Sequence, residues 1–227
     1  MYYYDSPAGL IIALISFVVA LAAQISVKSA YSKYSKIRVA SNMTGSQVAR
    51  IMVQNTKVRV VEHKGGRMSD HFDPRENIIA LSPEVFNGST VAALGIAAHE
   101  AGHALQHDQG YAPIKIRNGL ILPVAKIGSV MAMPLVFIGL IASLPFLIDL
   151  GIIFFSAALV CQVITLPVEF NASRRAAALL DKNAYLNKQE LGGAKSMLSA
   201  AAMTYVAAVV TSVLQLMRLL MMARRRR

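Results

Sequence analysis

Residues 97–107 read AAHEAGHALQH and contain the pattern H-E-x-x-H. On an α-helix, His99 and His103 lie one turn apart on one face, so both imidazoles can reach a single metal ion. The carboxylate of Glu100 lies beside them, where it can take up a proton from a water molecule that the ion activates. The pattern therefore predicts a zinc ion held by His99 and His103, with Glu100 as the catalytic base.

The residues around this pattern predict that it lies on a helix next to a small sheet. Ser89 is the expected N-cap of the helix. Residues 58–62 and 77–81 are rich in valine, isoleucine and other apolar residues, and the glycine, aspartate and proline residues between them favour turns, so both segments are expected to be strands. An apolar face at helical spacing lies behind the histidines and comprises Val91, Leu94, Ala98 and Leu105. We therefore expect a zincin-like catalytic domain in which the H-E-x-x-H helix packs on a small β-sheet.

The composition indicates a membrane protein. Of the 227 residues, 55% are hydrophobic and only 15% are charged, and the mean hydropathy is +0.49. Soluble proteins contain about 25% charged residues. The net charge of +11 would suggest a nucleic-acid partner in a soluble chain, but here the basic residues flank apolar runs, at 28–38, 174–175 and 224–227. We therefore expect contact with anionic lipid headgroups of the bilayer and no nucleic acid.

Apolar stretches divide the chain into five predicted regions. The uncharged run at 8–27 is long enough to cross a bilayer, and its aromatic, acidic start favours an uncleaved anchor over a signal peptide. The last stretch is interrupted by polar residues, so three to four transmembrane helices are expected in a mainly α protein. The predicted regions are an N-terminal anchor (1–27), a catalytic region (28–118), a transmembrane hairpin (119–166), a helical region with the third ligand (167–199) and an apolar helix with a basic tail (200–227).

Basic residues near the spans predict the orientation. Because Lys and Arg are enriched in cytoplasmic loops, the basic residues that follow the first span, precede the second and follow the third place both polar regions on the cytoplasmic side. Three spans satisfy this assignment. If the fourth also crosses, residues 224–227 end outside, against the rule, and both alternatives stay open.

A catalytic zinc ion usually has three protein ligands, and two histidines leave one missing. His107 shares their face but lies two turns from His99, about 11 Å along the axis, so it is expected to support a ligand or to end the helix. Glu169 is the better candidate, because an unpaired carboxylate at the end of an apolar span is costly and coordination removes that cost. The alternative is a glutamate that stabilises a helix start. Ser173, one turn later, could support a ligand.

Two further residues carry weaker hypotheses. His71 could stabilise an oxyanion in the transition state, and a turn-stabilising role is an equal alternative. Arg174 could also stabilise the oxyanion, although a pair of basic residues after a transmembrane span usually marks the cytoplasmic side of the membrane.

Three runs together resemble the bacterial YugP-type neutral zinc metallopeptidases: SDHFDP at 69–74, HEAGHALQH at 99–107 and EFNASRR at 169–175. The resemblance covers nearly the whole chain, and that family is similar to the HtpX-type and CAAX prenyl proteases, which are membrane gluzincins. It implies zinc on His99, His103 and Glu169, Glu100 as the base, and a place in the bacterial cell membrane. Gluzincins have an aspartate four residues after the ligand glutamate. This chain has Ser173 there, so that support is weaker or lies elsewhere.

These observations predict a multi-pass membrane zinc metalloendopeptidase with its site near the cytoplasmic face. Its expected substrates are polypeptides that are membrane-attached or partly unfolded, and the oligomeric state stays open. The alternative is a non-catalytic membrane scaffold stabilised by zinc, which would have no need of Glu100. An ion transporter is disfavoured, because the spans hold few ionisable residues.

Overall fold

The computed structural model describes residues 7–66 and 69–224, and most of them are helical. Contacts between residues divide the chain into two compact units, and three long helices contribute residues to both. Unit 1 comprises 1–24, 116–166 and 204–227, and unit 2 comprises 25–115 and 167–203. The aromatic N-terminus and the end of the predicted basic tail lie outside the described residues. The prediction of a mainly α membrane protein with a small sheet is confirmed.

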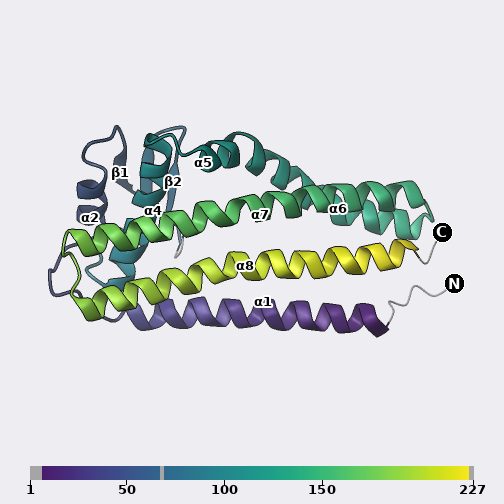
Figure 1. Cartoon of the computed structure of the whole chain (residues 1–227), viewed down its shortest axis with the longest axis horizontal. Coiled ribbons are helices and arrows are strands. Elements are labelled where there is room, and N and C mark those ends of the chain that lie inside the picture. Colours follow the sequence, from purple (N-terminus) through teal and green to yellow (C-terminus); the bar gives the residue numbers. More distant parts are fainter. Residues whose placement is uncertain (1–6, 67–68, 225–227) are drawn as a thin grey trace. The chain divides into compact units, whose positions relative to one another are not determined.

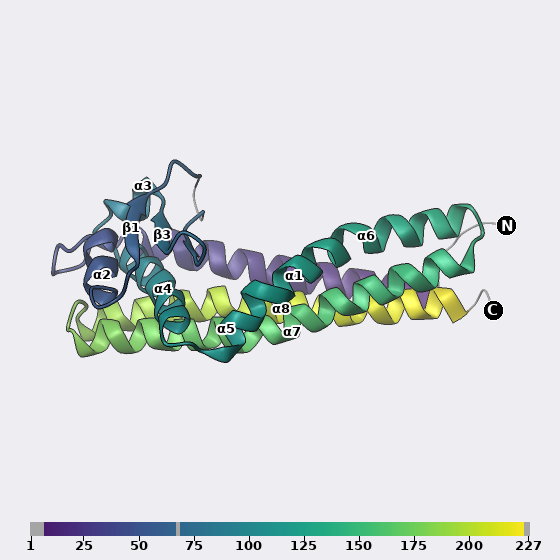
Figure 2. The ribbon, with the colours of Figure 1, turned by 90° about the horizontal axis from the view of Figure 1, so that it is seen from above.

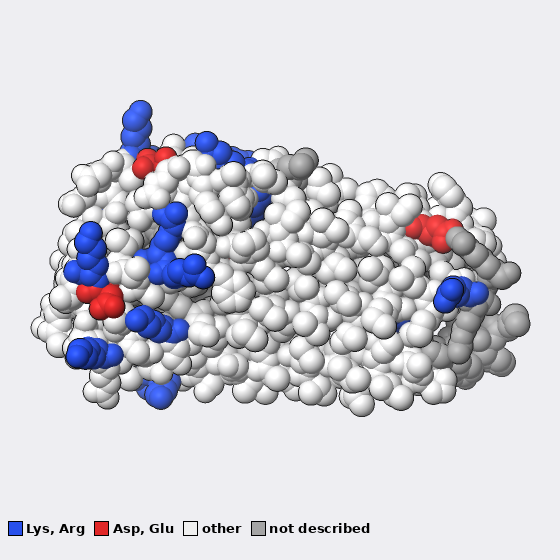
Figure 3. Space-filling view, viewed as in Figure 1, with Lys and Arg blue, Asp and Glu red and all other residues white. Residues whose placement is uncertain are grey.

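In the described part of the chain, four helices are long and apolar enough to cross a membrane. They are α1 (Pro7–Tyr34), α6 (Leu122–Ile141), α7 (Pro145–Lys182) and α8 (Lys188–Arg224) (Figure 1). Large apolar side chains point outward from them, and Leu14, Phe17 and Phe137 are each 63% exposed. The face of unit 1 seen in Figure 3 carries almost no charge between its ends. Such a surface suits acyl chains rather than water.

Small residues let α6 and α7 pack as a hairpin. A β-carbon on Gly151 would lie 2.6 Å from Val136 Cγ2, and one on Gly139 would lie 2.9 Å from the Ile148 amide nitrogen. Glycine at such positions allows membrane helices to approach closely. The segment before the hairpin comprises α5 (Ala112–Ile116) and a π-helical turn, η1 (Arg117–Ile121).

Unit 2 contains a three-stranded sheet in the order β1-β3-β2. β1 (Arg59–Glu62) is parallel to β3 (Ile78–Leu81), and β2 (His71–Asp73) is antiparallel to β3. The two predicted strands are present, whereas β2 was predicted as part of a turn. Three residues are too few to show an alternating pattern, so β2 carries no periodic signal. Because β3 is the central strand, β2 lies at an edge of the sheet.

The helices of unit 2 pack on this sheet around one apolar core. They include α2 (Gly45–Met52), α3 (Pro83–Phe86) and α4 (Val91–Asp108). Thr90, not the predicted Ser89, caps α4, because its side chain accepts a hydrogen bond from the Ala93 amide. The core joins α4 to the sheet and to residues of α7 and α8, and its members include Val48, Ile79, Leu81, Leu94, Ala176, Leu180 and Met197.

α7 does not end at residue 166, where the predicted span ends. It continues through Pro167 as one helix to Lys182. The boundary between the two units falls inside this helix, between Leu166 and Pro167. Glu169 is therefore carried by a long continuous helix rather than by a separate helical start, and Figure 2 shows α7 from above.

Candidate metal centre

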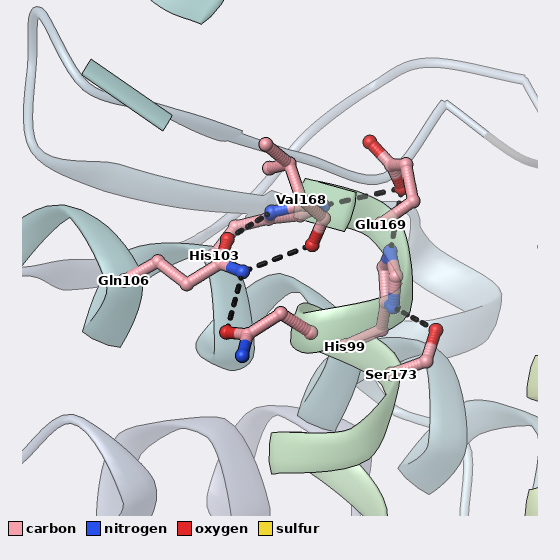
Figure 4. A network of polar contacts seen from close by, with 7 residues as sticks. His99, His103, Gln106, Val168, Glu169 and Ser173 are labelled. Carbon is pink, nitrogen blue, oxygen red and sulfur yellow. Dashed lines mark hydrogen bonds and ion pairs between the residues drawn. The ribbon is translucent and has the colours of Figure 1, made fainter. Parts of the chain in front are cut away.

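Two helices of unit 2 bring together three side chains that could bind a metal ion (Figure 4). His99 and His103 come from α4 and Glu169 from α7, and their ligand atoms all lie within 4.8 Å of one another. Glu169 Oε2 lies 3.4 Å from His99 Nε2 and 3.5 Å from His103 Nε2. Two imidazole nitrogens and a carboxylate form a donor set that zinc uses in catalytic sites, and the three residues could hold a metal ion.

Helical spacing explains the arrangement on α4. His99 and His103 are four residues apart, and their rings meet edge to face with centroids 4.7 Å apart. On α7, Glu169 and Ser173 are also one turn apart. The metal-binding face of each helix is therefore set by local sequence, while the pairing of the two faces depends on the fold.

Each histidine is also held by its second ring nitrogen. His99 Nδ1 lies 3.2 Å from the Ser173 hydroxyl oxygen, and His103 Nδ1 lies 3.0 Å from the side-chain oxygen of Gln106. With Nδ1 so occupied, Nε2 of each ring faces Glu169. Ser173 was among the predicted candidates. Gln106 was missed, and the available signal was a polar residue three positions after His103 on the inward face of the helix.

Glu100 lies beside the cluster and contacts the edge strand. Its carboxylate is partly buried and accepts a hydrogen bond from the backbone N–H of Phe72 in β2. Burial raises the pKa of Glu100 to about 7. The charge of His99 and the Phe72 N–H oppose this shift, while the Glu169 and Asp70 carboxylates add to it. A bound divalent cation would also oppose the shift, because positive charge favours the carboxylate.

Asp70 fixes the start of the edge strand. It accepts hydrogen bonds from the Ser82 amide at 2.7 Å and the Ser82 hydroxyl at 3.3 Å. Ser82 precedes α3, so this contact links β2 to the segment that leads into α4. Asp70 therefore helps to hold Phe72 next to Glu100.

The other predicted candidates lie outside the three-residue cluster. The ring of His107 packs against that of Phe72, with centroids 5.6 Å apart. His71 is exposed, and its Nδ1 lies 2.8 Å from the Ser69 carbonyl oxygen. Arg174 is exposed on α7. Roles for these three residues in the reaction stay predictions.

Comparison with known proteins identifies the family of the chain. Residues 9–224 match the family described as "Putative neutral zinc metallopeptidase", and the chain belongs to that family. It is 45% identical over 203 residues to a Bacillus subtilis (strain 168) protein named "Putative membrane protease YugP", covering 88% of this chain and 89% of that protein. No solved structure matches the chain. Zinc is therefore the cofactor expected at this site, and membrane localisation is supported by both the relative and the four apolar helices.

Proposed function

We propose that the protein is a membrane-embedded zinc metalloendopeptidase in which His99, His103 and Glu169 hold zinc and Glu100 is the general base. The observation that carries this proposal is the position of Glu100. Its carboxylate lies beside the His-His-Glu cluster and is oriented by the backbone of β2. A metal that only stabilised the fold would need no such group.

Zinc held by these residues would supply Lewis-acid chemistry, polarising a carbonyl and lowering the pKa of a water molecule. Glu100 removes a proton from the attacking water and later delivers it to the leaving amine. The Phe72 N–H holds the Glu100 carboxylate in place during both transfers. Ser173 and Gln106 keep the two histidines oriented.

The edge strand suggests how a substrate is held. β2 pairs with β3 along one side only, and it runs next to Glu100. An extended polypeptide can add to such an edge through main-chain hydrogen bonds. Binding by strand addition favours unfolded or flexible polypeptide segments over folded domains. Such segments include those of membrane-attached proteins.

The helices of unit 1 favour a multi-pass arrangement. In Figures 1 and 2 the start of α1, the α6–α7 turn and the end of α8 lie at the same end of this unit. Four crossings would place these three points on one side of the membrane. The basic residues after the first span, at 28–38, then assign the opposite side to the cytoplasm, and with it the catalytic region.

Cysteine labelling tests this orientation, because Cys161 is the only native cysteine and can be replaced by serine. In that background, Ser143→Cys lies in the α6–α7 turn and Lys57→Cys lies in unit 2. A membrane-impermeant thiol reagent should label the first variant in intact cells and the second only after lysis. The reverse pattern would overturn the orientation.

Zinc content and peptide hydrolysis test the function. In detergent-purified protein, wild type and Glu100→Gln should each hold about one zinc per chain, whereas Glu169→Ala should lose it. Only wild type should hydrolyse an unfolded casein substrate. A zinc-loaded wild type without hydrolysis would support the non-catalytic scaffold, and full zinc retention in Glu169→Ala would remove the third ligand.

A further inference from the structure

Gln106 is a completely buried polar side chain next to the metal cluster. Its exposure is 0%, and its amide makes three hydrogen bonds. The amide nitrogen donates to the Val168 carbonyl oxygen and to Asn171 Oδ1, each at 2.9 Å, and the amide oxygen faces His103 Nδ1 at 3.0 Å (Figure 4). A buried amide with all these partners has little freedom to reorient.

The direction of each hydrogen bond follows from Arg175. The guanidinium group can only donate, and Arg175 Nε lies 2.7 Å from Asn171 Oδ1, so that atom of Asn171 is an acceptor. Gln106 must then present its NH2 group to Asn171. The Val168 carbonyl oxygen, which can only accept, requires the same orientation.

This orientation determines the tautomer of His103. Because the NH2 group of Gln106 faces α7, its oxygen faces His103, and His103 Nδ1 must carry the proton. The lone pair of a neutral imidazole then lies on Nε2, the nitrogen that points toward Glu169. Only that tautomer can offer Nε2 to a metal ion.

The same side chain also fixes the backbone beside the third ligand. Val168 immediately precedes Glu169, and it is 62 residues from Gln106 along the chain. Gln106 therefore contacts one ligand through its oxygen and the backbone next to another through its nitrogen. It joins the two helices that supply the metal cluster.

We propose that Gln106 is a positioning residue for zinc. It holds His103 as the Nδ1-protonated tautomer and ties α4 to α7 beside Glu169. The orientation of its amide group is determined by Arg175 through Asn171. This inference rests on the proposed function, because it assumes zinc on His99, His103 and Glu169. Gln106 then has two separate roles. Its amide oxygen accepts a hydrogen bond from His103, and its amide nitrogen donates to α7, the helix that carries Glu169.

Substitutions at Gln106 and Asn171 test these two roles. In Asn171→Asp, both neighbours still donate to an acceptor, so zinc affinity should stay within about 3-fold of wild type. In Gln106→Glu, the carboxylate can accept from His103 but cannot donate to Val168 or Asn171. The affinity of Gln106→Met, which loses both the acceptor and the donor, should fall by about 10- to 100-fold, the range observed when a group that orients a metal ligand is lost. The affinity of Gln106→Glu should fall by less, because it keeps the acceptor for His103.

The experiment measures zinc affinity of the full chain in detergent by competition with a chelator, together with the 15N shifts of the histidine rings. In zinc-free protein, Gln106→Met should also shift the His103 signal toward a mixture of tautomers. Glu190→Gln is the control for loss of a buried polar contact elsewhere in unit 2, because Glu190 accepts from the Ala40 and Asn187 amides. It should lower thermal stability and leave zinc affinity unchanged.

The outcomes separate this inference from the proposed function. Failure of wild type to bind zinc would overturn the proposed function. Zinc binding by wild type together with unchanged affinity in Gln106→Met or Gln106→Glu would overturn the role of Gln106 alone. Equal loss of affinity in Glu190→Gln would show that the effect reflects general destabilisation, and would also overturn it.

Discussion

Gly102 of α4 lies so close to Ala172 of α7 that a β-carbon on Gly102 would be 2.7 Å from the Ala172 carbonyl oxygen. This contact falls between the two helix faces that carry the candidate ligands, because Gly102 precedes His103 and Ala172 lies three residues after Glu169. Ala172 is itself fully buried. The missing side chain at position 102 therefore lets the two helices approach closely enough for His103 and Glu169 to meet.

Gly102→Ala should weaken both the fold and the metal site. The new methyl group would meet backbone, which cannot rotate away, and overpacking of this kind typically costs about 1–3 kcal/mol. The helices would have to separate, so zinc affinity should fall together with the melting temperature.

Gly192→Ala is the matched control, because nothing lies within 4 Å of its β-carbon position. Replacing this exposed helical glycine should stabilise the protein by about 0.5–1 kcal/mol. Equal results for both variants would contradict the packing argument.

Ser173→Ala should reduce zinc affinity by about 10-fold, because it removes the hydrogen bond to His99 Nδ1. Ser173→Asp should raise the affinity above that of wild type, since a carboxylate partner makes the imidazole a stronger ligand. Chelator competition on wild type and both variants should give zinc affinities that decrease from Ser173→Asp to wild type to Ser173→Ala. An affinity for Ser173→Ala equal to wild type would show that the hydroxyl does not support the ligand.

Phe72→Pro should separate catalysis from metal binding. Proline has no N–H, so the Glu100 carboxylate loses the backbone donor that orients it. The sheet should tolerate the change, because that N–H points to Glu100 and proline is accepted on edge strands. Peptide hydrolysis should fall by about 10²-fold, the cost of a displacement of about 1 Å in an active site. Zinc content should not change.

Phe72→Leu provides the comparison for that substitution, because it alters the side chain and keeps the N–H. It should retain most of the activity. If both variants lost activity equally, the ring of Phe72, which contacts His107, would be the important group rather than its backbone.

Removal of zinc should lower the melting temperature of the wild type. A ligand that binds only the folded state stabilises it by about 4 kcal/mol when its free concentration is 1,000 times its dissociation constant. Melting curves with added zinc and with chelator should therefore differ in wild type and in Glu100→Gln. In Glu169→Ala the two curves should coincide, and a persistent zinc-dependent difference there would indicate a different ligand set.

The sequence predicts those parts of the fold and candidate site that depend on local spacing. His99 and His103 are one turn apart in any helix, and four long apolar segments are visible from the distribution of apolar residues along the chain. The strand containing Phe72 was not predicted, because three residues give no period. Gln106 was not identified, because two of its three hydrogen-bond partners, Val168 and Asn171, lie more than 60 residues away along the chain. Gly102 likewise has no visible function until Ala172 is placed against it.

The discontinuity of unit 2 has a consequence for how the protein is made. Its chain is interrupted after Lys115 and resumes at Pro167, and Glu169 lies in the second segment. A ribosome therefore completes the H-E-x-x-H helix, α6 and the part of α7 up to Leu166 before it reaches the third proposed ligand. A nascent chain at that stage carries His99, Glu100 and His103 but lacks the complete zinc site. The order of synthesis would thus delay completion of the proposed zinc site until α1, α6 and the apolar part of α7 have been translated.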